Sequence, residues 1–232
     1  MSDNAIGLLW LAYFQRKETK MKSRIIDPNK SYRFHDYFKL NIPPDELFAY
    51  FGYSKQNEVC NLPKATVDLS YFDGVKAYLE SFLRIANLSS ETARREILVA
   101  PILLHLGVYL QIPIEIEYPV NVNKQLKGKL DYYIQGQGNL LVIEAKHDDL
   151  SRGFTQLAVE LIALDKWLDD DPKPLYGIVS VGDIWKFGIL NRTTKLITQD
   201  INAYRVPADM YELLQILIAI LNGVEASGSP NL

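Results

Sequence analysis

Three charged residues on two neighbouring predicted strands are the part of this sequence best suited to chemistry. Asp131 lies in a predicted strand over residues 126–134. Glu144 and Lys146 close the next predicted strand, over residues 140–146, and side chains two positions apart on a strand share a face. A glycine-rich turn joins the two strands as a hairpin and brings Asp131 beside Glu144. Two carboxylates and an ammonium then meet in a mostly apolar sheet, where an isolated charge is costly to bury.

This combination of charges is suited to phosphodiester hydrolysis. Adjacent carboxylates repel each other and favour a cation between them, and oxygen ligands suit Mg²⁺ or Mn²⁺. Such an ion stabilises charge on phosphate oxygens, while a nearby lysine orients or activates the attacking water. The alternative is a salt bridge on an edge strand, because a Glu-x-Lys tripeptide arises by chance roughly once in a chain of this length. The apolar run over residues 140–143, directly before Glu144, favours the catalytic interpretation.

The same segments resemble the PD-(D/E)xK nuclease superfamily. The residues that carry this resemblance are Gly128-Lys129-Leu130-Asp131-Tyr132, Val142-Ile143-Glu144-Ala145-Lys146 and Gln156 on the following predicted helix. In pattern they are similar to the nuclease domains of type I restriction enzyme motor subunits. The order of the expected helices and strands predicts an α/β fold, with a mixed sheet flanked by helices on both faces. The resemblance implies that this fold is a restriction-endonuclease-like core.

The chain also resembles an uncharacterised group of bacterial, notably cyanobacterial, proteins. That resemblance covers nearly the whole chain from about residue 31, but it brings no known substrate. It rests on Asp36-Tyr37-Phe38, Phe51-Gly52-Tyr53, Arg95-Glu96, Ala100-Pro101-Ile102-Leu103, Tyr176-Gly177 and Trp185-Lys186-Phe187.

The superfamily resemblance implies a set of metal ligands. Asp131 and Glu144 would bind Mg²⁺ or Mn²⁺, with the carbonyl of Ala145 as a further oxygen ligand. Glu96 matches the glutamate that the superfamily carries on its first core helix and would complete the shell, directly or through water. Glu91, one and a half turns earlier, is the competing candidate, and either residue could instead be a solvated helix glutamate.

Two further residues receive catalytic roles from the resemblance. Lys146 would position the attacking water, and Gln156 would orient Lys146 or a phosphate. An ordinary surface glutamine is the alternative for Gln156. Glu160 stands where the restriction relatives carry a tyrosine, and the i, i+4 spacing places it on the same helix face as Gln156.

Basic residues gather around the motif in a chain whose formal net charge is −3. Contacts from such side chains to phosphates supply affinity without sequence preference. We therefore expect DNA as the partner, and a homodimer is left open. For Lys124 and Lys127 a solvated charged loop is the alternative. The expected nucleic-acid-binding residues are Lys124, Lys127, Lys129 and Arg152.

Composition points to a reducing, cytoplasmic setting without a membrane partner. The single cysteine excludes an intrachain disulfide and a cysteine-built zinc site, and three separated histidines disfavour a histidine metal site. No segment approaches the roughly 18 apolar residues of a membrane span. The apolar residues 5–14 lack a preceding positive charge and predict a short helix rather than a signal peptide. Alternatively, Met21 is the natural start.

The remaining pattern divides the chain into three parts. Residues 1–88 form an aromatic, mainly helical N-terminal extension with helices over 46–51 and 73–86, residues 89–225 form the nuclease-like core, and residues 226–232 form a loose tail. In the core, a helix over 91–106 is kinked at Pro101 and ended by Gly107. The other expected core elements are strands over 112–120, 126–134, 140–146, 175–181 and 184–190, an added strand at 195–197, and helices over 151–168 and 210–221.

These observations predict a metal-dependent nuclease, with DNA endonuclease activity in restriction, defence or repair as the first expectation. A catalytically inactive nuclease fold that binds nucleic acid or protein is the alternative. A third possibility is an RNA-cleaving or nucleotide-triggered effector.

Overall fold

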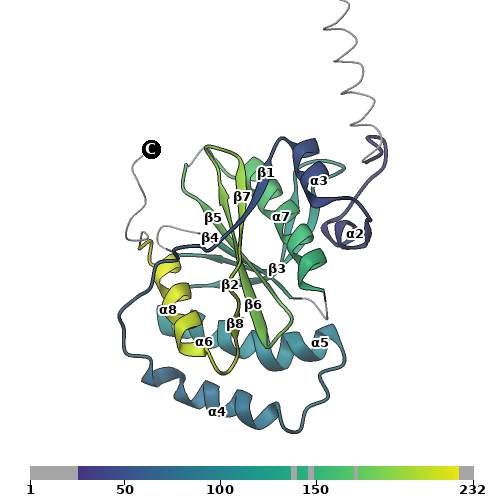
Figure 1. The fold of residues 1–232 in the computed structure, drawn as a ribbon. Coiled ribbons are helices and arrows are strands. Elements are labelled where there is room, and N and C mark those ends of the chain that lie inside the picture. The colour runs from purple at the N-terminus through teal and green to yellow at the C-terminus, as the bar shows by residue number, and fades with distance from the viewer. Residues whose placement is uncertain (1–25, 137–139, 146–148, 170–171, 225–232) are drawn as a thin grey trace, which may run out of the picture.

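A mixed β-sheet is the centre of the computed structural model (Figure 1). The structure describes residues 26–136, 140–145, 149–169 and 172–224, with the backbone alone for residues 140–145. The predicted helix over residues 5–14, the hairpin tip at 137–139, Lys146 and the C-terminal tail lie outside the described residues.

The sheet contains both parallel and antiparallel pairs, as the sequence predicted. Its strands are β1 (Ser54–Glu58), β2 (Ile114–Asn121), β3 (Lys127–Gln135), β4 (Leu140–Ala145), β5 (Leu175–Ser180), β6 (Ile184–Asn191), β7 (Leu196–Asp200) and β8 (Tyr204–Arg205). Their order is β1-β7-β6-β5-β4-β3-β2, with β8 paired to β6. The pairs β1–β7 and β4–β5 are parallel, and the others are antiparallel.

Helices cover both faces of the sheet (Figure 1). They are α2 (Phe34–Lys39), α3 (Pro44–Phe51), α4 (Asp73–Phe82), α5 (Glu91–Arg94), α6 (Ala100–Leu110), α7 (Leu150–Trp167) and α8 (Met210–Leu221), with a 3₁₀ turn η1 (Ser70–Phe72). Strand β5 shows the two layers. Tyr176 and Ile178 pack with α4, α6 and α8, whereas Leu175 and Val179 pack with α2, α3 and α7. The α/β class with helices on both faces is therefore confirmed.

Strand β1 is an element that the sequence analysis missed. Its residues, Ser-Lys-Gln-Asn-Glu, are mostly exposed and show no apolar alternation. The strand pairs in parallel with β7, from Ser54 opposite Leu196 to Glu58 opposite Asp200. Backbone pairing therefore places this segment at the sheet edge, and the N-terminal region adds a strand to the same sheet as the core.

The helix expected over residues 91–106 is longer and less regular than predicted. A π-helical segment, η2 (Arg95–Val99), separates α5 from α6, and the Ala100 N–H donates to the Arg95 carbonyl. Pro101 has no N–H to give the carbonyl four residues earlier, which accounts for this wider turn. The prediction that Gly107 ends the helix was wrong. A Cβ there would meet Ile114 Cδ1 at 2.8 Å, so this glycine permits close packing of β2 instead.

The other expected helices match α3, α4, α7 and α8, although α4 ends at Phe82 rather than at residue 86. No helix within the described ranges combines the length and the apolar character that crossing a membrane requires.

Candidate active site

Helix α2 is fixed against the β2–β3 turn, although about 90 residues separate them in the sequence. The Tyr32 N–H donates to the Lys124 carbonyl at 2.9 Å, and the Tyr37 hydroxyl donates to the Gln125 carbonyl at 2.7 Å. Phe34 lies so close to Gly128 that a Cβ at that glycine would meet the ring at 2.6 Å. The glycine of the Gly-x-x-Asp-Tyr motif is therefore the point where α2 meets β3.

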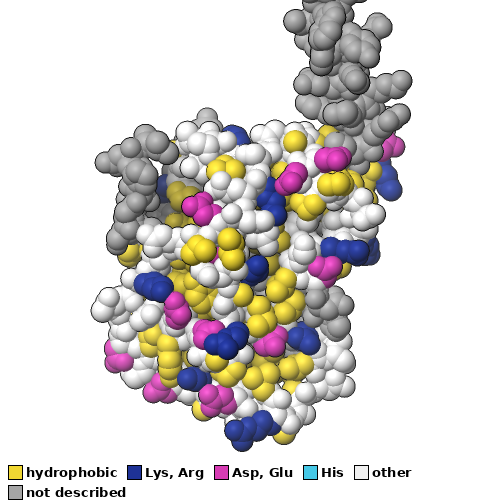
Figure 2. Space-filling model, viewed as in Figure 1, with side chains coloured by type: hydrophobic (Ala, Val, Ile, Leu, Met, Phe, Trp, Pro, Cys, Tyr) yellow, Lys and Arg dark blue, Asp and Glu magenta, His cyan; other side chains and the backbone are white. Residues whose placement is uncertain are grey.

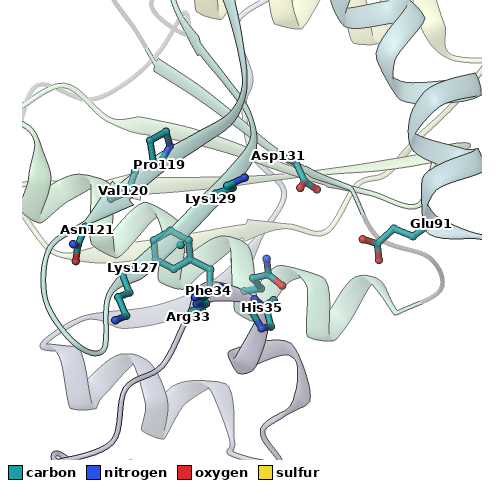
Figure 3. A pocket seen from close by; sticks show the side chains of 12 residues that line it. Arg33, Phe34, His35, Glu91, Pro119, Val120, Asn121, Lys127, Lys129 and Asp131 are labelled. Atoms are coloured by element: carbon teal, nitrogen blue, oxygen red, sulfur yellow. The ribbon is translucent and has the colours of Figure 1, made fainter.

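A cavity of about 520 Å³ opens beside this contact (Figure 3). Four expected site residues line it: Lys127, Lys129 and Asp131 from β3, and Gln156 from α7. The rest of the lining comes from the start of α2, from α5, from β2 and from β3 itself: Arg33, Phe34, His35, Glu91, Pro119, Val120, Asn121 and Gly128. The structure thus brings part of the predicted constellation together at one cavity.

The expected carboxylate pair lies on adjacent strands. Antiparallel pairing of β3 with β4 aligns Tyr132 with Ile143, and the same register continued by one residue sets Asp131 across from Glu144. On its other side, Glu144 is aligned with Val179 of β5. The Glu144 side chain and the whole of Lys146 lie outside the described residues, and Ala145 is described only as the last backbone position of β4.

The competing helix glutamates occupy different positions. Glu91 lines the cavity, and Figure 3 shows its side chain reaching from α5 toward the same space as Asp131. Glu96 is not among the lining residues. Its side chain is 57% exposed, and it accepts a bond of 3.2 Å from Arg95. Of the two candidates, Glu91 is the one that shares the cavity with Asp131.

Arg95 carries a positive charge close to the candidate carboxylates. Burial alone would lower the pKa of Arg95, but its hydrogen bond to Glu96 and the charge of Asp131 outweigh burial and raise it. Burial, and then the charge of Glu96, raise the pKa of the neighbouring Tyr132 to about 12. Glu96 therefore acts electrostatically on β3 without lining the cavity.

Gln156 is a buried residue rather than a surface glutamine. It is 3% exposed, and its Nε2 donates to Oε1 of Glu160, which is fully buried, at 2.9 Å. Two glycines let helix α7 lie close to the sheet. A Cβ at Gly177 would meet Leu157, and a Cβ at Gly188 would meet Phe154, each within 3 Å. Close packing of α7 thus holds Gln156 at the cavity.

The predicted nucleic-acid-binding residues separate into two groups. Lys127 and Lys129 line the cavity, and Lys129 Nζ also lies 2.6 Å from Oε2 of the exposed Glu117. Lys124 and Arg152 are not among the lining residues, and Arg152 is paired with Asp149 at 3.3 Å. The face seen in Figure 2 shows lysine and arginine interspersed with acidic side chains rather than in one large basic patch.

Glu117 has an unusual backbone at the position across from Asp131. The register of β2 against β3 pairs Ile116 with Tyr132 and Tyr118 with Leu130, so the backbone position of Glu117 lies opposite that of Asp131. Its φ of 54° lies in the left-handed region, which a non-glycine residue rarely adopts. Such local strain occurs frequently at functional sites, and here it adjoins the candidate carboxylate.

Sequence reasoning missed Arg33, His35 and Asn121. No spacing linked residues 33 and 35 to a motif that begins at Gly128, because the contact depends on tertiary packing. A metal would draw its oxygen donors from Asp131, Glu91 and the adjacent Glu144. Within residues 26–136, 149–169 and 172–224, no three acidic, histidine or cysteine side chains form a metal-binding group.

Comparisons of this chain with protein-family models, with curated proteins and with solved structures find no match.

Proposed function

We propose that this chain is a metal-dependent nuclease of the PD-(D/E)xK type with a restriction-endonuclease-like core, and that DNA is its substrate. The observation that carries the proposal is the register of β3 against β4, which sets Asp131 across from Glu144 beside the cavity. Two carboxylates on adjacent strands repel each other, and a cation between them relieves that repulsion. The cavity also holds Lys127 and Lys129, which supply positive charge for a phosphodiester backbone.

The chain's residues have separate roles in this proposal. Asp131, Glu144 and the Ala145 carbonyl would hold Mg²⁺ or Mn²⁺, with Glu91 or Glu96 as the remaining carboxylate. The bound ion would supply charge stabilisation for phosphate oxygens. Lys146 would orient the attacking water and stabilise developing negative charge. Gln156, held by Glu160 in the buried helix α7, would orient Lys146 or a phosphate.

The experiment that tests the proposal is cleavage of supercoiled plasmid, linear duplex and single-stranded DNA in Mg²⁺ or Mn²⁺, with EDTA as the blank. Asp131→Asn and Glu144→Gln preserve size and should each abolish cleavage. Lys64→Ala is the matched control, because Lys64 pairs with Glu212 on the exposed surface and lines no part of the cavity. Parent-like cleavage by both carboxylate variants would refute the proposal.

A second candidate is a nuclease fold that binds nucleic acid without cleaving it. The observation in its favour is Arg95, whose charge interacts with that of Asp131 and offsets some of the carboxylate repulsion without a metal. In that case the protein would bind DNA in EDTA and in Mg²⁺ alike, and neither ion would raise its melting temperature.

A further inference from the structure

We propose that the cavity takes one unpaired nucleic-acid strand, and that α2 binds the strand's phosphates through Arg33 and His35. The inference rests on the proposed nuclease function and names the substrate class of that site. Its basis is the placement of α2, an element outside the motif-bearing strands, as one wall of the cavity that contains Asp131 (Figure 3).

Charge is divided along this cavity. Arg33, the N-cap residue of α2, and Lys127 from β3 lie toward one end, and the carboxylates of Asp131 and Glu91 lie toward the other (Figure 3). Among the described residues, neither Arg33 nor Lys127 is in an ion pair. Their charges are therefore available to a ligand, and a phosphodiester backbone that reaches Asp131 would pass them.

His35 extends the same wall toward the carboxylates. Its side chain is 56% exposed, and its Nε2 lies 3.2 Å from Oδ1 of Asp36. An imidazole N–H donates to a phosphate oxygen whether or not the ring carries a charge, provided that its tautomer is suitable. The side chains of Arg33 and His35 thus offer two hydrogen-bond donors, one on each side of the anchored Phe34 in the sequence.

The size of the cavity favours one strand over two. Its volume of about 520 Å³ is in the range of pockets for small ligands, about 300–1,000 Å³. The bonds from Tyr32 and Tyr37 hold α2 against the β2–β3 turn, and Asn123 Oδ1 accepts from the N–H groups of Gln125 and Leu126 within that turn. A site of that volume takes a ligand of small-molecule size, such as a short stretch of unpaired strand, whereas a duplex would have to lie across its mouth.

The test is binding of labelled single-stranded DNA, single-stranded RNA and blunt duplex DNA in EDTA, by fluorescence anisotropy at several salt concentrations. We expect the parent to bind one of the single strands at least tenfold more tightly than the duplex, and the DNA and RNA arms identify which sugar is accepted. The double variant Arg33→Ala/His35→Ala should bind the single strand at least tenfold more weakly. The slope of the logarithm of the binding constant against the logarithm of the salt concentration, here called the salt slope, should fall in magnitude by about 0.7 for each phosphate that the variant no longer neutralises.

Lys39→Ala is the matched control, because Lys39 is an exposed cation in the last turn of α2 that does not line the cavity. Its affinity should stay within twofold of the parent. Arg33→Lys retains the charge and should recover part of the affinity. Melting curves of all variants identify any that fail to fold. If the double variant does not fold, the affinity of Arg33→Lys is compared with that of the parent instead.

The outcomes separate this inference from the nuclease proposal. Duplex binding as tight as single-strand binding, or unchanged affinity in the folded double variant, would overturn the inference even if Mg²⁺-dependent cleavage is observed. Loss of single-strand binding in the double variant, with no cleavage by the parent in Mg²⁺ or Mn²⁺, would support the cavity as a strand-binding site and refute the nuclease function.

Discussion

Replacing Asp165 should destabilise the fold strongly, because this buried carboxylate joins three elements. Its oxygens accept from Arg192 Nε at 2.8 Å, from Lys195 Nζ at 2.7 Å and from the Tyr53 hydroxyl at 2.5 Å. The side chains of Asp165 and Arg192 are 2% and 6% exposed. Asp165→Ala would leave the Arg192 guanidinium buried without its carboxylate, and breaking such a pair costs about 3–5 kcal/mol.

The other members of this network should contribute less. Tyr53→Phe removes one hydrogen bond to a charged group and should cost about 1.5–3 kcal/mol. The Lys195 side chain is 46% exposed, so Lys195→Met should cost about 0–1 kcal/mol. For a chain of this size the effect of Asp165→Ala corresponds to a melting-temperature decrease of roughly 6–20 °C.

The pH dependence of stability gives an independent check. Burial alone would raise the pKa of Asp165, but hydrogen bonds from Arg192, Lys195 and Tyr53 outweigh burial and hold the pKa below its ordinary value. The stabilisation is therefore complete above the unfolded pKa of about 3.9 and is lost as the pH falls through the lower folded pKa. The difference in stability between the parent and Asp165→Asn should be constant from pH 7 to 5 and shrink below about pH 4.

The assay is urea unfolding followed by tryptophan fluorescence and circular dichroism, with melting curves at each pH. A free energy of unfolding for Asp165→Ala within 1 kcal/mol of the parent would refute the reasoning. So would a difference between the parent and Asp165→Asn that grows as the pH falls.

The remaining predictions concern the candidate site. Glu91→Gln should reduce Mg²⁺-dependent cleavage at least tenfold and Glu96→Gln less than threefold, because of these two residues only Glu91 lines the cavity. Initial cleavage rates compare the two variants, and a larger loss in Glu96→Gln would make Glu96 the helix glutamate of the site. Mg²⁺ at a hundred times its Kd should stabilise the parent by about 2.7 kcal/mol, or roughly 5–10 °C, and Asp131→Asn should lose that shift; an equal shift in the variant would place the metal elsewhere. Lys127→Ala should lower the magnitude of the salt slope of DNA binding by about 0.7–0.9, whereas Lys124→Ala should not, since Lys124 does not line the cavity. Fluorescence anisotropy at four salt concentrations measures both slopes, and equal slopes for the two variants would contradict this division between Lys127 and Lys124.

The sequence predicted the central elements of the fold because their patterns are local. Local runs of apolar residues located β2, β3, β5 and β6 to within two residues at each end. The helical period did the same for α7. Strand β1 could not be found in this way, because its five polar residues are placed by pairing with β7, more than 130 residues later.

The candidate site was predictable only where its residues are close in sequence. The motif around Asp131 and Glu144 could be read from one hairpin, but the position of Glu91 rather than Glu96 at the cavity could not. Whether a helix glutamate faces a cavity depends on the helix's phase, and the π-helical segment at Arg95–Val99 changes that phase within the interval concerned. Arg33 and His35 reach the cavity through the packing of Phe34 on Gly128, a contact that no local pattern encodes.

The measurement that tests the central claim most directly is cleavage of saturating DNA by the parent and by Lys146→Ala in Mg²⁺, beside the metal-induced melting shift of each. Nuclease chemistry at this hairpin predicts that Lys146→Ala loses cleavage by at least a hundredfold and keeps the metal-induced shift. In the proposed mechanism the lysine acts on the water and the phosphate, where a fixed charge can contribute several kcal/mol, and is not a metal ligand. Undiminished cleavage by Lys146→Ala, or no cleavage by the parent in either ion, would contradict the account.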